Sequence, residues 1–303
     1  MKSFLTLADW TREELDHALD VAAALKASLR RGEETPRLKG RVLGMIFHKP
    51  SLRTRLSFEV GMWQLGGKGL MITDKEIGFG SREAVKDIGA VMSRYLDAIM
   101  IRTFHQKDVE DLDRHASLPV INGLTGEHHP CQVLSDLLTL KERGIEADGL
   151  PVAYLGDGNN MAHSWLDAAR RYALDLRLGC PKGYGPDPRL FDAAKAQGKG
   201  RVRLTDSPEE AVEGARVVYT DTWTSMGQEA EAAARRKVFP PFQLNRALLR
   251  GADPGVVVMH CLPAHRGEEI TDDVIDGPHS IVYDQAENRL HAQKGLLVAC
   301  FED

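Results

Sequence analysis

The fold is decided by VLGMIFHKPSLRTR, the stretch that runs from Val42 to Arg55. Its first six residues are almost all apolar and predict a buried β-strand, and Ser51 stands where it can cap a new helix. The free backbone N–H groups and the positive end of the helix dipole then point at one place, where a guanidinium can bind a phosphate through two hydrogen bonds. This stretch therefore predicts an anion-binding site just past the end of a strand.

The two arginines of this stretch have different predicted roles. Arg53 and Arg55 are two residues apart, so they cannot face the same way on a helix. We expect Arg53 to point at the anion, and we expect Arg55 to form a surface ion pair with Glu59, four residues further on. Taken alone, the segment also fits a capped helix with an exposed arginine and no ligand.

Short β-branched runs alternate with longer amphipathic stretches along the whole chain, which predicts parallel sheets covered by helices on both faces. The predicted strands are 41–47, 69–73, 97–102, 118–122, 151–156, 175–178, 202–205, 216–221 and 255–260. We expect an α/β protein of two doubly wound parallel-sheet domains, linked by a helix at about 130–143. The C-terminal helix, at about 285–303, should return to the first domain, which spans 1–146. The second domain spans 147–284.

Composition excludes several classes of protein. The chain has 303 residues, with 39 Lys and Arg against 44 Asp and Glu, a net charge of −5 and no block of like charge, so we expect no nucleic-acid or membrane partner. The first residues lack the apolar core of a signal peptide, and no apolar run approaches the roughly 18 residues of a membrane span. Four cysteines without paired spacing fit reduced thiols, and neither a metal site nor a cofactor is indicated. We therefore expect a cytoplasmic protein.

Polar groups fall just past the predicted strands, where open α/β sheets bind ligands. In the first half, Arg102 ends a strand, and two alternatives stay open for it: contact with solvent alone, or a second guanidinium for the anion. His129 and Gln132 are one helical turn apart, and an imidazole N–H beside a carboxamide suits a polarised carbonyl and its NH2 group. We expect both halves to face one cleft, with one substrate held by each.

The second half has a different chemistry. The turn at 156–160, Gly-Asp-Gly-Asn-Asn, lacks the glycine spacing of a dinucleotide site, and no Walker-type sequence occurs. The turn offers amide and carboxylate groups, and Asp221 in the next loop adds another carboxylate, so this side should prefer a ligand with amino groups. Cys261 fits a buried inert thiol, or a polar group beside Asp221. The polar segment 225–231 could fold over the second substrate as a lid.

Five segments, in this order and spacing, resemble the signature set of the ornithine carbamoyltransferases, in the aspartate/ornithine carbamoyltransferase family. They read FHKPSLRTR from Phe47, HPCQ from His129, GDGNN from Gly156, DTWTSMG from Asp221 and HCLP from His260. The first two are shared with aspartate carbamoyltransferases, and the Ser-Met-Gly and His-Cys-Leu-Pro elements point to ornithine. The resemblance covers almost the whole chain.

The resemblance implies which residues bind the substrates. Those implied for carbamoyl phosphate are Ser51, Leu52, Arg53, Thr54, Arg102, His129, Gln132, Cys261, Leu262 and Arg289. Those implied for ornithine are Asn160, Asp221, Ser225 and Met226, and those implied in catalysis are Arg53, His129, Asp221 and Cys261. It also implies a homotrimer or an assembly of trimers, direct attack of the amine without a covalent intermediate, and citrulline and phosphate as products.

The chain departs from the family pattern at two places, which leaves some points open. Leu52 stands where Thr is usual, although backbone N–H groups should preserve the site. Gly78 stands where many members have a polar residue that reaches the phosphate of a neighbouring subunit, so Ser81 or Arg82 replaces that contact or it is absent. The alternatives are a carbamoyltransferase for putrescine or an N-acylated ornithine, a nucleotide-binding oxidoreductase and a non-catalytic binding protein. The direction of the reaction in metabolism is not encoded in the pattern.

Overall fold

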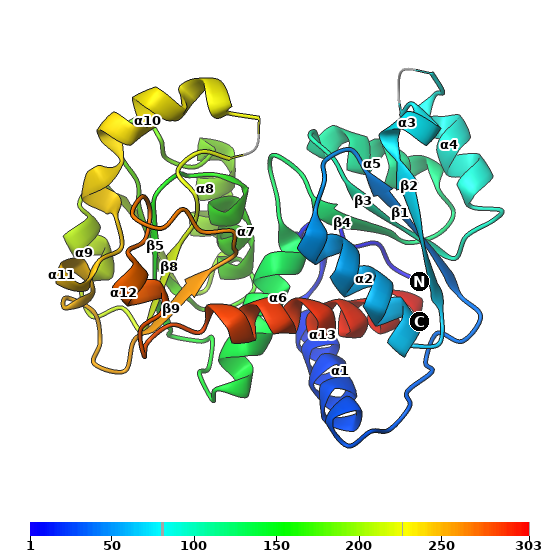
Figure 1. Cartoon of the computed structure of the whole chain (residues 1–303), viewed down its shortest axis with the longest axis horizontal. Helices are drawn as coiled ribbons and strands as arrows, with labels where there is room; N and C mark the ends of the chain where they lie inside the picture. Colours follow the sequence, from blue (N-terminus) through cyan, green and yellow to red (C-terminus); the bar gives the residue numbers. More distant parts are fainter. Residues whose placement is uncertain (80–81, 226, 303) are drawn as a thin grey trace. The chain divides into compact units, whose positions relative to one another are not determined.

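The computed structural model describes residues 1–79, 82–225 and 227–302, and its contacts divide the chain into two compact units (Figure 1). Unit 1 consists of residues 1–142 and 287–303, and unit 2 of residues 143–286. Met226 and Ser81, both named in the predictions, lie outside the described residues. In the described part of the chain, the search for a helix with the length and apolarity of a membrane span finds none.

Unit 1 is built on a four-stranded parallel sheet with the order β2-β1-β3-β4. Its strands are β1 (Val42–Phe47), β2 (Lys68–Thr73), β3 (Ala98–Arg102) and β4 (Val120–Leu124). Its helical elements are η1 (Leu7–Asp9), α1 (Arg12–Arg30), α2 (Leu52–Gln64), α3 (Asp74–Ile77), α4 (Val85–Met92), α5 (Gln106–His115) and α6 (Pro130–Glu142). The last helix, α13 (Val282–Phe301), begins in unit 2 and belongs to unit 1 from residue 287 onward.

Helices cover both faces of this sheet. Alternate strand residues point to opposite sides, and in β3 and β4 both sets of side chains are buried, so each face needs a covering layer. Ile46, Ile99 and Ile101 pack with Val109 and Leu112 of α5 in one buried cluster. On the other face, α2 packs closely enough that a Cβ on Gly69 of β2 would lie 3.0 Å from the Met45 side chain and 3.4 Å from the Cα of Glu59. The strands β1, β3 and β4 are therefore buried on both sides, as their nearly continuous apolar sequences predict, whereas the edge strand β2 is partly exposed.

Unit 2 repeats the same plan with five parallel strands in the order β7-β6-β5-β8-β9. The strands are β5 (Pro151–Leu155), β6 (Asp175–Gly179), β7 (Arg201–Thr205), β8 (Val217–Thr220) and β9 (Val257–His260). The helical elements are α7 (Asn160–Ala169), α8 (Pro188–Gln197), α9 (Pro208–Val212), η2 (Glu229–Glu231), α10 (Ala232–Val238), η3 (Pro240–Phe242), α11 (Arg246–Leu249) and α12 (Asp272–Ile275).

Both faces of this second sheet are also covered. Leu155 and Val258 pack in a cluster with Val212 of α9 and Val274 of α12. On the opposite face, Tyr154 and Tyr219 stack with ring centroids 5.8 Å apart, and Trp165 of α7 packs edge-on against Tyr219. The predicted class, two doubly wound parallel-sheet α/β domains, is confirmed.

The predicted strands and helices match the structure with small shifts at their ends. The strand predicted at 118–122 is observed as β4 (Val120–Leu124), two residues later, and Pro119 just before it has no backbone N–H for the ladder. The connecting helix is α6, and the last helix begins at Val282, three residues before the predicted start. The return of that helix to unit 1 is confirmed, since Asn288 donates to Thr139 Oγ1 at 3.0 Å and accepts from Lys26 at 2.6 Å.

Candidate active site

In unit 1 the polar groups follow three neighbouring strands, β1, β3 and β4, on both sides of the point where the strand order reverses. Ligands bind at such a point because the loops on either side of it diverge. Ser51 caps α2, as predicted, and its Oγ accepts from the backbone N–H of Thr54 at 3.2 Å. The side chain of Leu52 is 71% exposed, so Leu52 can offer an anion only its backbone N–H.

Two buried arginines from distant parts of the chain converge on Thr54 in the first turn of α2. Arg289 of α13 donates to Thr54 Oγ1 at 3.1 Å, and Arg102 at the end of β3 approaches the same oxygen at 3.4 Å. Arg289 also donates to Gln132 Oε1 at 2.8 Å. Thr54, Arg102, Gln132 and Arg289 therefore form one hydrogen-bonded cluster.

His129 lies in the positive field of this cluster. Burial lowers the pKa of His129 well below its ordinary value, and the charges of Arg289, Arg102 and Arg53 lower it further. The imidazole is therefore neutral at physiological pH, and a neutral imidazole carries one N–H donor and one acceptor nitrogen. Because the charge of Arg53 contributes to the lowered pKa of His129, Arg53 also belongs to the positively charged surroundings of this imidazole.

Arg55 has the separate role that the sequence predicts for it. Its Nε lies 3.2 Å from Glu59 Oε2, and both side chains are largely exposed. The surface ion pair is confirmed.

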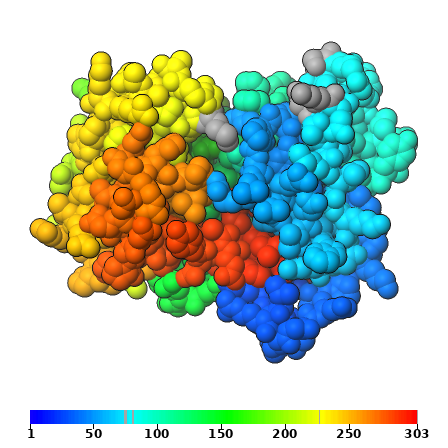
Figure 2. Space-filling model, in the orientation of Figure 1, coloured from blue at the N-terminus to red at the C-terminus, as the bar shows by residue number. Residues whose placement is uncertain are grey.

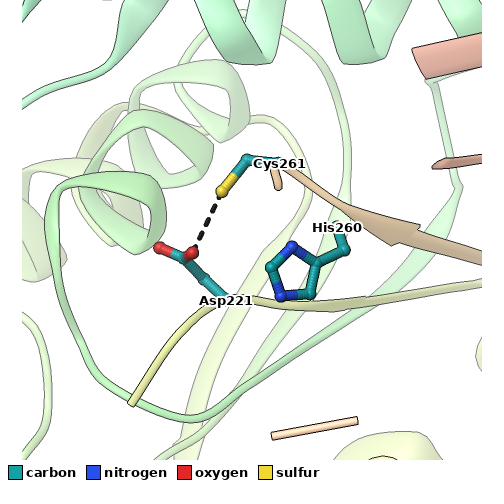
Figure 3. A group of neighbouring side chains, drawn as sticks. All are labelled: Asp221, His260 and Cys261. Atoms are coloured by element: carbon teal, nitrogen blue, oxygen red, sulfur yellow. Dashed lines mark hydrogen bonds between the residues drawn. The ribbon is translucent and has the colours of Figure 1, made fainter. Parts of the chain in front are cut away.

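In unit 2 the polar groups again follow three neighbouring strands, β5, β8 and β9. Asp221, buried after β8, accepts through Oδ1 from the Cys261 thiol at 3.0 Å and from its own neighbour Thr222 N at 2.7 Å. Its Oδ2 accepts from Asn159 Nδ2 at 2.8 Å. Figure 3 shows the thiol of Cys261 directed at this carboxylate, which joins the β8 and β9 loops.

Asn159 is a residue that the sequence reasoning missed. It is the N-cap of α7, where its Oδ1 accepts from Met161 N at 2.9 Å while its Nδ2 holds Asp221. Asn160, which was predicted instead, is the half-buried first residue of the helix. The signal was present, because asparagine immediately before a helix is a preferred cap.

The Gly158 turn brings these groups together because only glycine fits there. A Cβ on Gly158 would lie 2.2 Å from the backbone carbon of Gly185, and its N–H donates to Tyr184 O at 2.8 Å. Any side chain would push the 157–159 turn away from the loop after β6. This close approach explains the Gly-Asp-Gly-Asn-Asn sequence without a nucleotide.

His260 holds the Cys261–Leu262 turn through a hydrogen bond to the backbone of that turn. Its Nδ1 accepts from Leu262 N at 2.8 Å, so its proton is assigned to Nε2, which donates to Glu269 Oε1 at 3.0 Å. Leu262 has φ 56°, in the left-handed region that a leucine rarely adopts, and its N–H bond to the imidazole helps to hold it there. Glu269 was not predicted, and nothing in its spacing distinguishes it from a surface carboxylate.

Asp221, His260 and Cys261 offer possible metal-ligand atoms that lie within 4.8 Å of one another (Figure 3). Both nitrogens of His260 already have hydrogen-bond partners, in Leu262 and Glu269. A metal ion would have to break one of these bonds, so the set is better suited to a polar ligand than to a metal.

Two further orienting contacts involve predicted residues. Gln132 Nε2 donates to Asp136 Oδ1 at 2.9 Å, so both ends of its amide have partners and its orientation is defined. Asp136 is four residues after Gln132 on α6, a spacing from which the pair could have been found. Ser225 bonds through its backbone N–H to Gln228 Oε1 at 3.1 Å.

One unit thus presents guanidinium groups at a helix N-terminus, and the other presents a carboxylate with amide and thiol groups. Fold and sites together define a two-domain α/β protein with a polar ligand site at the carboxyl edge of each sheet.

Comparison with known proteins gives the particular family. The family model described as "Aspartate/ornithine carbamoyltransferase, carbamoyl-P binding domain" matches residues 2–142, and that described as "Asp/Orn binding domain" matches residues 148–300. The chain belongs to the aspartate/ornithine carbamoyltransferase family.

Similar proteins extend over the full length of the chain. The ornithine carbamoyltransferase of Syntrophotalea carbinolica is 50% identical over 296 residues, which cover 98% of each chain. That of Thermococcus kodakarensis is 50% identical and covers 98% of this chain and 95% of its own. The structure of the Pyrococcus furiosus ornithine carbamoyltransferase superimposes with a TM-score of 0.94 at 49% identity, covering 98% of this chain and 96% of that one.

Proposed function

We infer that the chain transfers the carbamoyl group from carbamoyl phosphate to the δ-amine of L-ornithine, giving L-citrulline and phosphate. Relatives that share half of its residues over nearly the whole length are named for this activity. The single observation that carries the assignment is the division of charge: guanidinium groups converge at a helix start in unit 1, and Asp221 lies among amide and thiol groups in unit 2.

Carbamoyl phosphate is assigned chiefly to unit 1. Its dianionic phosphate suits the N-terminus of α2 with its nearby arginines, because a helix start offers free N–H groups and guanidinium groups bind phosphate in a bidentate way. The carbamoyl end suits the neutral His129 and the second N–H of Gln132. The proposed residues are Ser51, Leu52, Arg53, Thr54, Arg102, His129, Gln132 and Arg289, joined by Cys261 and Leu262.

Ornithine is assigned to unit 2. Its amino groups suit the carboxylate of Asp221, which Asn159 and Thr222 hold in place by hydrogen bonds. Direct contacts are proposed for Asn160, Asp221, Ser225 and Met226, the last of which lies outside the described residues.

The reaction is a direct acyl transfer. The neutral δ-amine attacks the carbonyl carbon, the C–N bond forms, the negative charge of the tetrahedral intermediate rests on the carbonyl oxygen, and the C–O bond to phosphate then breaks. The proton lost from nitrogen goes to the departing phosphate. Because such an amine has a pKa of about 10.4 in water, the site must select its neutral form, and Asp221 and Cys261 orient it for attack.

Preorganised donors lower the barrier to this attack. A neutral His129 N–H directed at the carbonyl oxygen stabilises it as charge develops, and Arg53 and Thr54 stabilise the leaving phosphate. Holding the reactants in register supplies about 7–11 kcal/mol more. The mechanism therefore requires that both ligands come together in the reacting complex.

We also propose that the enzyme is a homotrimer, or an assembly of trimers, in the cytoplasm. Unit 1 exposes large apolar side chains on and beside α2, which lies on the visible face in Figure 2: Leu52, Leu56, Trp63 and Leu70. Leu52, Leu56 and Trp63 follow the four- and seven-residue spacing of one helix face, and exposed apolar surface that gathers on one face often marks a protein interface. All four cysteines, which lie among the described residues, are thiols that form no disulfide, which fits a reducing compartment.

Gly78 bears on the contact between subunits. It has φ +59°, and a Cβ there would lie 2.6 Å from the Cβ of Arg82, so the turn cannot hold a polar side chain at this position without strain. The exposed Arg82 is the proposed substitute for the phosphate contact, and Ser81 lies outside the described residues. In size-exclusion chromatography with light scattering we expect a multiple of three times the 33.5 kDa chain, and a monomer would contradict this proposal.

The decisive experiment is a colorimetric ureido-product assay with carbamoyl phosphate and a panel of amines. We expect product with L-ornithine and at least about 100-fold lower kcat/KM with putrescine, N-acetyl-L-ornithine and L-aspartate, because an unfilled polar subsite costs several kcal/mol. Preference for putrescine or the N-acylated amine would reassign the substrate. Absence of product with every amine would refute the proposed carbamoyltransferase activity.

A further inference from the structure

Arg235 of α10 is a buried arginine that no step of the proposed reaction uses. It is only 4% exposed, and its contacts reach four separate segments of unit 2. Nη1 donates to Trp223 O at 2.8 Å and lies 3.0 Å from Asp157 Oδ2, while Nη2 lies 2.9 Å from Glu231 Oε2.

Aromatic rings enclose the same guanidinium. Its central carbon lies 5.0 Å from the Tyr184 ring centroid and 5.6 Å from that of Phe239, within the range of a cation–π contact. These two rings pack edge to face at 4.9 Å. The planar fork of arginine meets several partners at once, which an ammonium group could not reproduce.

The partners of Arg235 lie at both ends of the loop that carries Ser225. Trp223 precedes this loop and Glu231 follows it, so the Arg235 side chain holds both of its ends. Asp157 belongs to the turn after β5, two residues before Asn159, which orients Asp221. Within the loop, the backbone N–H of Ser225 donates to Gln228 Oε1 at 3.1 Å, and the backbone N–H of Gln228 donates to the carbonyl oxygen of Ser225 at 3.0 Å.

The charge of Asp157 depends on a crowded environment. It faces Arg235 and Glu231 from the helical side, Asp221 from the β8 loop, and Tyr154 and Cys180 from β5 and the end of β6. Burial raises the pKa of Asp157 to about 6, with Asp221 and Glu231 adding to the rise and Arg235 opposing it. Asp157 therefore gains a proton just below neutral pH, while the arginine keeps its charge.

We propose that Arg235 is a positioning residue for ornithine: it fixes both stems of the Ser225 loop to the Asp157 turn, and it does so fully only while Asp157 is ionised. The inference rests on the proposed function, because it assigns that loop to the amine substrate. It implies that acid weakens ornithine binding and leaves carbamoyl phosphate binding in unit 1 unchanged.

Steady-state kinetics from pH 5.5 to 8.5, with each substrate varied in turn, tests the proposal. At pH 7.5, Arg235→Gln should raise KM for ornithine about 10- to 100-fold with a smaller change in kcat, as small displacements of positioning groups can cost 100-fold. KM for carbamoyl phosphate should stay within about twofold, and Arg235→Lys should restore part of the loss. The matched control is Arg236→Gln, since the adjacent Arg236 is exposed and pairs with Glu268 at the surface.

The pH profile separates positioning from a merely structural role. With KM expressed as the concentration of ornithine whose δ-amine is neutral, the wild-type KM should rise as the pH falls below about 6, and Asp157→Asn should abolish that rise. A lower melting temperature in Arg235→Gln with both KM values unchanged, or an unchanged rise in acid in Asp157→Asn, would overturn the proposal. Should Arg235→Gln fail to fold, the Asp157→Asn profile decides.

The rate of amide hydrogen exchange in the peptide covering 222–231 measures how firmly the loop is held, and this measurement needs no substrate. Faster exchange in Arg235→Gln than in Arg236→Gln supports the proposal, and equal exchange overturns it. A wild type that makes no citrulline refutes the proposed function, and this exchange measurement still decides whether Arg235 holds the loop.

Discussion

The two units have the same plan at the carboxyl edges of their sheets, and they place opposite charges there. In unit 1 the loops after β1, β3 and β4 bring Arg53, Arg102 and His129 toward Arg289. In unit 2 the corresponding loops after β5, β8 and β9 bring together Asn159, Asp221 and Cys261. The sheet determines where a ligand binds, and the loop residues determine which ligand it is.

The units also differ in how they orient their charged groups. In the unit 1 site, Arg102 and Arg289 donate to neutral acceptors, the Thr54 hydroxyl and the Gln132 carbonyl. Asp221 in unit 2 meets neutral donors, and the neighbouring Asp157 is the carboxylate that pairs with an arginine. The unit 1 site is therefore lined by guanidinium groups, and the unit 2 site by the carboxylate of Asp221.

Among the substitutions that test this division of charge, removal of Arg53 should have the largest effect on the rate. We expect Arg53→Ala to lower kcat about 10²- to 10³-fold with the fold intact, since one preorganised donor is worth about 2.7–4 kcal/mol of barrier. Arg55→Ala should stay within about twofold, because an exposed ion pair contributes little. Citrulline formation and circular dichroism measure the two quantities, and equal losses in both variants would remove the distinction between these arginines.

Removal of the Asp221 charge should act on the other substrate. Asp221→Asn should raise KM for ornithine about 10- to 100-fold, because a hydrogen bond to a charged group is worth about 1.5–3 kcal/mol, and KM for carbamoyl phosphate should change little. The matched control is Asp206→Asn, an exposed carboxylate that follows β7 at the same edge of the same sheet. A larger rise in KM for carbamoyl phosphate than for ornithine would reverse the assignment of the units.

Most of the fold could be predicted because its signals are local. Apolar runs such as 42–47 and 257–260, each followed by polar residues, locate the strands and the edge that binds ligands. Ser51 and Pro130 likewise mark helix starts from their own chemistry. The strand order is not local, because it depends on which distant strands pair in the folded sheet, and the sequence predicted none.

The candidate site was predicted less completely, because the missing residues act through others. Asn159 and Glu269 orient Asp221 and His260, and those contacts join segments 62 and 9 residues apart. Arg235 holds Asp157 from 78 positions further along the chain (235 − 157). Such pairs become visible only when the chain has folded.

Cysteine reactivity should distinguish the thiol at the site from the buried thiols. Cys261 is half-buried, whereas burial raises the pKa of Cys131 to about 12 and also raises the pKa of Cys180 and Cys300. We expect iodoacetamide to modify Cys261 at least about tenfold faster than the other three, and ornithine to slow that reaction, since reactivity follows thiolate character and access. Peptide mass spectrometry reads all four sites, and protection of Cys131 in place of Cys261 would count against the site.

The smallest predicted effect is an opposite pH dependence of stability in the two units. His129 has a lowered pKa when folded, so the unfolded chain binds more protons below about pH 6.5 and stability falls as the pH drops, by up to about 1.4 kcal/mol per pH unit. Asp157 has a pKa raised to about 6, so the folded chain binds the extra proton and this contribution to stability is lost as the pH rises from about 4 to 6.

Urea denaturation between pH 5 and 7 checks both signs. His129→Gln should lessen the loss of stability in acid, and Asp157→Asn should increase it. The same direction of change in both variants would contradict the assignment of these two groups.

A crystal structure of the enzyme with carbamoyl phosphate and L-norvaline, which is ornithine without its δ-amine, tests most directly whether each unit holds one reactant. We expect the phosphate at the N-terminus of α2 beside Arg53 and Arg102, and the terminal carbon of norvaline beside Asp221. The gap to the carbonyl carbon should then leave room for an amine at about 3–3.5 Å from that carbon. Phosphate bound beside Asp221, or two ligands too far apart for one amine nitrogen to bridge, would contradict the account.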